Sequence, residues 1–101
     1  MTNKTIKVMI VDDQALVLDI LSKGLSKDPS IEIVATATDG QIALNQIYRA
    51  KPDVIILDME MPRMNGIEFL HKLMPVNPIP TIVLSARSEE HTSELQSPNT
   101  I

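Results

Sequence analysis

Four short apolar runs alternate along the chain with three segments of helical periodicity. The runs cover residues 6–11, 31–37, 53–57 and 81–84, and they are rich in β-branched residues. Continuous apolar runs of this length are typical of strands that are buried on both faces, as in parallel sheets. We therefore predict a buried strand in each of the four runs.

The three intervening segments predict helices. Apolar residues recur every three or four positions within residues 15–27, 41–50 and 67–74. The side chains predicted to face the core are Val17, Leu18, Leu21, Leu25, Ile42, Ala43, Ile47, Ile67, Leu70 and either Leu73 or Met74. We interpret the pair Asp39-Gly40, which precedes the second of these helices, as a turn.

The alternation of strands and helices predicts an α/β fold. Strands joined by helices form a parallel sheet that is covered by helices on both faces. Right-handed crossovers limit the topology to a few doubly wound arrangements. Ligands in such folds bind outside the carboxyl ends of the strands, so the residues that directly follow the strands are the first candidates for chemistry.

Three aspartates occupy these positions. Asp12 and Asp13 follow the first strand, and Asp58 follows the third. These two strands are neighbours in a doubly wound sheet, so we expect the three carboxylates to lie within several ångströms of one another. Two like charges about 4 Å apart repel by roughly 4 kcal/mol at an effective dielectric constant near 20. The group is therefore either partly protonated or filled by a cation.

The chemistry of the three aspartates favours magnesium. Carboxylate oxygens without histidine or cysteine partners prefer Mg²⁺ to zinc. Mg²⁺ with few protein ligands keeps positions open for phosphate oxygens, and an aspartate beside it can act as a nucleophile that forms an acyl phosphate. Taken alone, Asp13 could instead be only the N-cap of the helix that follows it.

Composition narrows the range of functions. The 101 residues suit one domain at most, and the net charge of −4 gives no electrostatic support for nucleic-acid binding. The absence of cysteine excludes a disulfide scaffold, a thiolate metal site and cysteine catalysis. No apolar run approaches the length of a membrane span, and the N-terminus lacks a signal-peptide core. We therefore expect a cytoplasmic protein that makes no membrane contact.

Three segments carry a family resemblance. VDDQALV at residues 11–17, PDVIILDMEMPRMNGIEFL at 52–70 and TIVLSA at 81–86 together resemble the receiver domain of two-component response regulators. The resemblance runs from about residue 6 to residue 86. It implies the flavodoxin-like receiver fold, with strand order 2-1-3-4-5, and a module that switches an output domain outside this chain.

The resemblance also implies roles for single residues. Asp58 would be the phosphoacceptor, which takes a phosphoryl group from a sensor histidine kinase. Mg²⁺ would be bound directly by Asp13, Asp58 and the backbone carbonyl of Glu60, and mainly through water by Asp12. Ser85 would be the switch hydroxyl, which turns towards the phosphoryl group.

Within the family, the sequence is most similar to the receiver of the chemotaxis protein-glutamate methylesterase. The segment LMPVNPIPTIVLSA at residues 73–86 carries this similarity, whereas DPSIEIVATATDG at 28–40 is shared with regulators that have a helix-turn-helix output domain. The chain contains neither a G-x-S-x-G elbow nor a DNA-reading helix. We therefore expect no enzymatic activity and no nucleic-acid binding from the chain itself.

Residues 87–101, RSEEHTSELQSPNTI, depart from the family pattern. The family implies a further helix, a fifth strand that ends in Lys-Pro and a last helix, but this segment has neither a strand pattern nor an amphipathic face. Residues 87–97 resemble the in-frame translation of a widely used sequencing-library adapter. We therefore predict a partial receiver domain at 1–86, which lacks the last helix-strand-helix unit, and a non-native, disordered tail at 87–101.

Two other functions provide alternatives. A receiver-like domain that is not phosphorylated could act only in protein–protein contacts, although the presence of Asp12, Asp13, Asp58 and Ser85 weighs against this. A phosphatase of the haloacid dehalogenase type would also use an aspartate nucleophile at a strand end. Such enzymes need a second aspartate two residues later, and here Glu60 holds that position.

Overall fold

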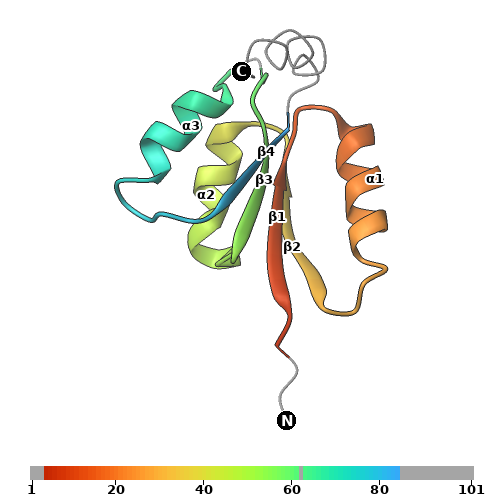
Figure 1. Ribbon diagram of the computed structural model, residues 1–101. Helices are drawn as coiled ribbons and strands as arrows, with labels where there is room; N and C mark the ends of the chain where they lie inside the picture. Colours follow the sequence, from red (N-terminus) through yellow and green to blue (C-terminus); the bar gives the residue numbers. More distant parts are fainter. Residues whose placement is uncertain (1–3, 62, 85–101) are drawn as a thin grey trace, which may run out of the picture.

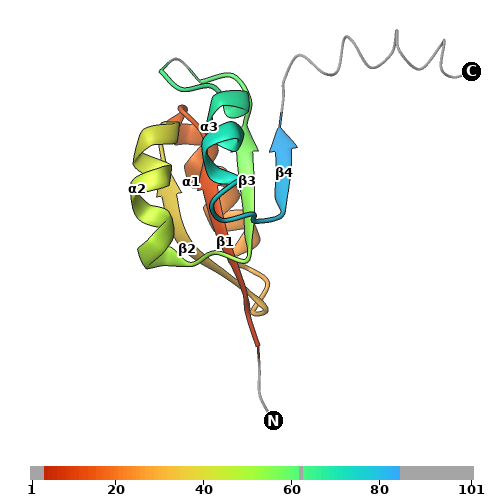
Figure 2. The same cartoon turned by 90° about the vertical axis from the view of Figure 1, so that its left-hand side faces the viewer.

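The protein folds into three layers, with a parallel sheet between helices. A computed structural model describes residues 4–61 and 63–84. The strands are β1 (Ile6–Val11), β2 (Ile31–Ala37), β3 (Val54–Asp58) and β4 (Thr81–Leu84), and the helices are α1 (Ala15–Leu25), α2 (Gly40–Ala50) and α3 (Gly66–Leu73). Helix α1 covers one face of the sheet, and α2 and α3 cover the other (Figure 1, Figure 2).

The topology of the sheet agrees with the predicted fold class. All strand pairs are parallel, and the strand order is β2-β1-β3-β4. This is the order predicted for the first four strands of the flavodoxin-like receiver fold. The observed elements agree with the predicted ranges to within two residues at each end. The predicted fifth strand and the predicted tail at 87–101 lie outside the described residues.

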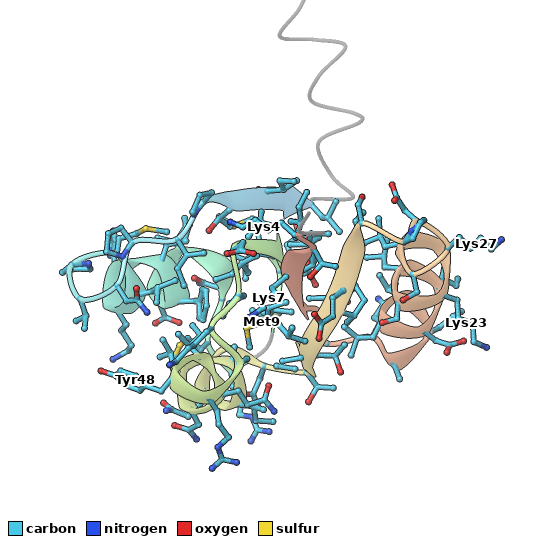
Figure 3. The ribbon with its side chains drawn as sticks, turned by 90° about the horizontal axis from the view of Figure 1, so that it is seen from below. Lys4, Lys7, Met9, Lys23, Lys27 and Tyr48 are labelled. Carbon is cyan, nitrogen blue, oxygen red and sulfur yellow. The ribbon has the colours of Figure 1, made fainter. Side chains whose placement is uncertain are left out.

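Strand β1 lies at the centre of the core because it is paired along both edges and covered on both faces. Met9, Ile10 and Val11 have an exposed fraction of 0%. Met9 and Val11 belong to the core beneath α2 and α3, and Figure 3 shows Met9 on that side of the sheet. Ile10 packs instead with Leu18 of α1. Burial on both faces explains why the run is continuously apolar rather than alternating.

Two side chains that we predicted to face the core are exposed. Ile42 of α2 is 37% exposed and Ile67 of α3 is 56% exposed, whereas Phe69 is fully buried. The buried residues of α3 are Gly66, Phe69 and Leu73. Ile67 follows Gly66 directly and therefore lies about 100° around the helix from this buried line. The prediction was wrong because α3 has apolar residues on more than one side, so the pattern did not identify its inner face.

Side-chain caps define where two of the helices begin. The Oδ1 atom of Asp39 accepts the backbone N–H of Ile42 at 2.9 Å at the start of α2. Asn65 and Glu68 form a capping box at the start of α3. Such caps satisfy N–H groups of the first turn that have no partner within the helix. Helices α2 and α3 therefore begin directly after the loops that follow β2 and β3.

Candidate functional site

The carboxyl ends of β1 and β3 bring the three predicted aspartates together. Val11 pairs with Leu57 in the parallel register of these strands, so Asp12 and Asp58 follow at the same edge of the sheet. One carboxylate oxygen from each of Asp12, Asp13 and Asp58 lies within 4.8 Å of the others. The predicted convergence of the three carboxylates is confirmed.

Asp12 is buried, and backbone hydrogen bonds fix its position. Its N–H donates to the carbonyl of Ala37 at the end of β2, at 3.0 Å. Its Oδ1 atom accepts the N–H of Gln14 at 2.9 Å. Gln14 is the N-cap of α1 and makes no side-chain cap hydrogen bond. Asp13 therefore does not cap this helix, and the alternative prediction that Asp13 is only an N-cap is wrong.

Asp58 ends β3, and the loop that follows folds back on it. Glu60 donates its N–H to Oδ1 of Asp58 at 3.0 Å. Met59 donates its N–H to the carbonyl of Leu84 in β4, and Gly66 donates its own to the carbonyl of Met59, both at 3.2 Å. The backbone of Glu60 therefore lies beside the carboxylate of Asp58.

Gly66 allows the chain to return this closely. A Cβ atom at this position would collide with the Met59 side chain and would lie only 2.8 Å from the Met59 Cα atom. The same Cβ would lie 3.3 Å from the carbonyl oxygen of Asp58. Because part of the obstacle is backbone, a side chain here could be accommodated only if the end of β3 moved.

The surroundings of Asp58 raise its pKa. Burial of the carboxylate is the largest cause, and the negative charges of Asp12 and Asp13 raise the pKa further, although the hydrogen bond from the Glu60 N–H opposes them. The two ion pairs found within residues 4–61 and 63–84 do not involve these aspartates. Burial and like charges both disfavour the ionised carboxylate, and a bound cation would offset them.

A hollow of about 290 Å³ opens over the carboxylates. It is lined by Asp12, Asp13, Gln14, Val17, Asp58, Glu60 and Leu84. A larger hollow of about 550 Å³ lies between β2 and α2, but no carboxylate lines it. The smaller hollow is the candidate site because hard oxygen donors converge there. The three carboxylates form a set of hard oxygen donors that fits Mg²⁺.

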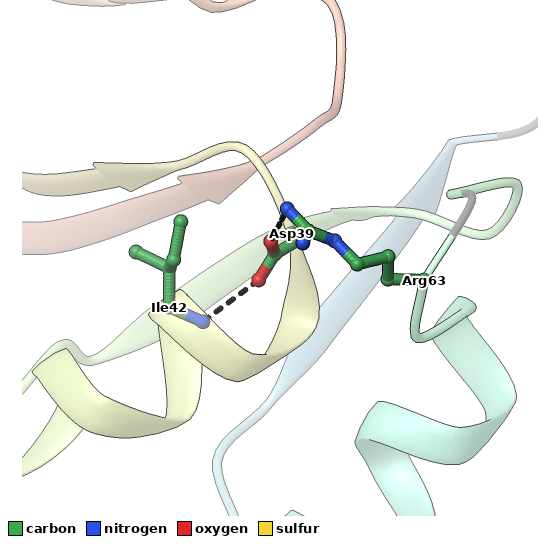
Figure 4. A network of polar contacts seen from close by, with 3 residues as sticks. All are labelled: Asp39, Ile42 and Arg63. Carbon is green, nitrogen blue, oxygen red and sulfur yellow. Dashed lines mark hydrogen bonds and ion pairs between the residues drawn. The ribbon is translucent and has the colours of Figure 1, made fainter.

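The sequence interpretation missed a polar contact beside this site. Asp39 is not only part of a turn, because it is buried with 6% exposure and its Oδ2 atom lies 3.2 Å from the guanidinium group of Arg63 (Figure 4). An aspartate before a helix was a signal for the cap. No local pattern could have predicted its distant partner. Ser85, the predicted switch hydroxyl, lies outside the described residues.

Fold and site together define a class: a doubly wound α/β domain with an acidic site at the carboxyl ends of its central strands. Residues 8–96 match the response regulator receiver domain family, and the chain belongs to this family. The matched range includes all three clustered aspartates. It also continues past residue 86, so it does not mark a domain boundary there.

Most of this chain matches part of a longer protein. A protein-glutamate methylesterase/protein-glutamine glutaminase from Syntrophotalea carbinolica is 52% identical over 87 residues, which make up 86% of this chain and 25% of that protein. The chain thus spans about a quarter of the length of this relative. The shared part is the receiver domain, which is not itself catalytic. The haloacid dehalogenase alternative is therefore not supported.

Solved structures agree with this assignment. The response regulator domain of CheB from Thermotoga maritima is 38% identical with a TM-score of 0.80, and the match covers 86% of this chain and 65% of that domain. A chain from the complex of the CheA3 P1 domain with CheY6 from R. sphaeroides is 31% identical with a TM-score of 0.73. This match covers 93% of the present chain and 76% of the chain from the complex. None of the helices in the described part of the chain could cross a membrane.

Proposed function

We propose that Asp58 accepts a phosphoryl group from the phosphohistidine of a sensor histidine kinase, and that this modification switches an output domain. The convergence of the carboxylates of Asp12, Asp13 and Asp58 within 4.8 Å is the observation that carries the proposal. Membership of the receiver family supports it. The similarity to a chain from a complex with the CheA3 P1 domain supports a kinase as the phosphoryl donor.

The transfer requires mainly position and charge from the protein. A carboxylate oxygen of Asp58 attacks the phosphorus atom in line, and the bond between phosphorus and the histidine nitrogen breaks. The electron pair of that bond returns to the imidazole ring, and an acyl phosphate forms on Asp58. The hydrogen bond from the Glu60 N–H to Oδ1 of Asp58 holds the carboxylate in one orientation for this attack.

Asp13, Asp58 and the backbone carbonyl of Glu60 would hold Mg²⁺, and Asp12 would act through water. When bound, the cation offsets the like charges of the site and neutralises phosphoryl oxygens. The indirect role suits Asp12 because its side chain is buried and already accepts the N–H of Gln14.

Strand β4 is the proposed route from phosphorylation to the output surface. Phosphorylation adds about −1.5 to −2 charges at Asp58. Leu84 pairs with Asp58 in the register of β3 and β4, and the next residue along the chain is Ser85. In the proposal, the Ser85 hydroxyl turns towards the phosphoryl group and the surface near β4 repacks.

Radioactive acetyl phosphate or a phosphorylated kinase would test this proposal. We expect the parent protein to be labelled in the presence of Mg²⁺, with the label lost when Mg²⁺ is chelated. The Asp58→Asn variant should take up no label. Asp19→Asn is the matched control, because Asp19 is an exposed carboxylate on α1 that pairs with Lys23.

The alternative function predicts a different result in the same assay. A pseudo-receiver that acts only through protein–protein contacts would remain unlabelled under all conditions, and it would not respond to beryllofluoride with Mg²⁺. If the folded parent protein gave that result, the phosphoacceptor function would be wrong.

The proposal extends to the rest of the protein. We propose a methylesterase output domain, because the similar protein from S. carbinolica is a methylesterase of which the matched residues make up only 25%. We also propose that the native receiver sequence stops near residue 86 and that residues 87–101 derive from a sequencing adapter. Codons from Arg87 onward that differ from the adapter would contradict this.

The proposed site of action is the cytoplasm, with no membrane or nucleic-acid contact made by this domain.

A further inference from the structure

The loop between β3 and α3, residues 59–65, is fixed at both of its ends. At its start the N–H of Glu60 is bonded to Asp58. At its end Asn65 caps α3, and the N–H of Gly66 bonds back to the first residue of the loop. These contacts fix where the loop leaves and rejoins the regular structure, and between them Met61, which is 5% exposed, packs into the core.

The start of α2 and the residue before it contact the second half of the loop. The Oδ2 atom of Asp39 lies 3.2 Å from the guanidinium group of Arg63, which reaches across to the start of α2 (Figure 4). Gly40 lies against the neighbouring side chain, since a Cβ on Gly40 would lie 2.8 Å from Sδ of Met64. Asp39 before α2 and Gly40 at the start of α2 therefore meet two consecutive residues of the loop.

The end of β2, just before the turn that leads into α2, contacts the other side of the carboxylate site. The carbonyl of Ala37, two residues before Asp39, accepts the N–H of Asp12 at 3.0 Å. The segment 37–40 thus touches Asp12 on one side and the loop that carries Glu60 on the other. This segment therefore connects the two parts of the site, in addition to the pairing of β1 with β3.

The two partners of the ion pair differ in how firmly they are held. The side chain of Asp39 is only 9% exposed, and the Ile42 N–H fixes its other oxygen, whereas the side chain of Arg63 is 78% exposed. An exposed arginine adds little to the stability of a fold. When its partner is fixed, however, the attraction between the two charges restrains the segment that carries the arginine.

We infer that Arg63, through Asp39, is a positioning residue for the metal site. The pair holds the loop so that the backbone of Glu60, whose N–H is bonded to Asp58, stays beside this carboxylate. This inference rests on the proposed function, because it assumes that Mg²⁺ binds to the three aspartates and to Glu60.

The direction of the effect on Mg²⁺ binding separates this role from plain electrostatics. Removing the positive charge of Arg63 lowers the repulsion of a cation by the protein, so charge alone would make Mg²⁺ bind more tightly. Loss of a positioning contact would make Mg²⁺ bind more weakly. The two explanations therefore predict opposite changes in the dissociation constant.

Calorimetric titration of the full chain with Mg²⁺ alone would test the inference. We expect Arg63→Ala to raise the dissociation constant for Mg²⁺ about 3- to 10-fold. This increase is small for the loss of a residue that supports metal ligands, because the arginine is mostly exposed. Arg63→Lys should restore most of the affinity. The matched control is Lys23→Ala, because Lys23 pairs with Asp19 at the same 3.2 Å on α1, away from the loop.

A second variant shows whether the arginine acts through its partner. Asp39→Asn keeps an acceptor for the Ile42 N–H but removes the charge that Arg63 contacts. We expect Asp39→Asn, Arg63→Ala and the double variant to weaken Mg²⁺ binding to a similar extent, because all three break the same contact. The amide signal of Glu60 in nuclear magnetic resonance spectra should shift in each variant and stay unchanged in Lys23→Ala.

The possible outcomes separate the two proposals. Unchanged or tighter Mg²⁺ binding by Arg63→Ala would overturn the positioning role, and so would additive effects of the two single substitutions. In either case the proposed function would stand, provided that the parent protein binds Mg²⁺ and Asp13→Asn weakens that binding. If the parent protein bound no Mg²⁺, the proposed function itself would be wrong.

Discussion

Asp12 and Asp39 are both buried aspartates at the same end of the sheet, but their carboxylates have different partners. They are 5% and 6% exposed, and they follow neighbouring strands. Asp39 accepts a helix N–H with one oxygen and pairs with Arg63 through the other. Asp12 accepts the N–H of Gln14 but faces the carboxylates of Asp13 and Asp58.

The comparison separates a structural carboxylate from a functional group of carboxylates. Contacts within the protein satisfy Asp39, so this residue stabilises the start of α2 and needs no ligand. In the group around Asp12, burial and then the like charges at close range raise the pKa of Asp58, and the like charges favour a cation. Removing a carboxylate should therefore have different consequences in the two regions.

The largest expected effect concerns Mg²⁺ binding at the functional group. We expect Asp13→Asn to raise the dissociation constant for Mg²⁺ about 10- to 100-fold, because the site loses a charged oxygen ligand. Titration calorimetry would measure it, with the exposed Asp19→Asn as the control. Equal affinities for the parent protein and Asp13→Asn would show that the cation does not bind where we propose.

The next largest effect concerns the loop at residues 59–65, which lies between Asp39 and the three carboxylates. We expect Gly66→Ala to lower the free energy of unfolding by about 1–3 kcal/mol, because the new Cβ meets the backbone of Met59. In Gly24→Ala the Cβ would have no atom within 4 Å, so we expect this control to stabilise α1 by about 0.5–1 kcal/mol. Urea unfolding would measure both changes, and a similar effect of the two substitutions would contradict the close approach.

Removing one carboxylate from each region should change stability in opposite directions. We expect Asp39→Ala to lower the free energy of unfolding by about 0.5–2 kcal/mol, because the N-cap of α2 is lost. We expect Asp58→Asn to raise the melting temperature of the metal-free protein by about 2–5 °C, because it removes a like charge while an acceptor for Glu60 remains. Thermal unfolding at pH 7 with a chelator would decide, and a lower melting temperature for Asp58→Asn would break the comparison.

The smallest expected effect is on the pH dependence of stability without metal. The pKa of Asp58 in the folded protein lies above its ordinary value of 3.8. Between these two values the folded state binds more protons than the unfolded state, so stability should fall as pH rises through this window. Thermal unfolding in this pH window should therefore show a contribution of this sign in the parent protein that is absent from Asp58→Asn. Identical pH profiles for the two proteins would contradict it.

Much of the fold and of the candidate site could be predicted from local sequence patterns. The period of the apolar residues distinguishes strands from helices, and their alternation requires a parallel sheet. In such a sheet all carboxyl ends lie at one edge, so Asp12, Asp13 and Asp58 had to meet once the strand order was known. The sequence by itself therefore determined the class of fold and the acidic site.

The tertiary structure alone decided which contacts surround that site. The inner face of α3, the exposure of Ile67 and the absence of a cap at Asp13 depend on how the helices pack against the sheet. The contact of Arg63 with Asp39 depends on a loop and a turn that are distant in sequence. Local patterns reflect interactions between near neighbours along the chain, whereas contacts of this kind are set by the packing of whole elements.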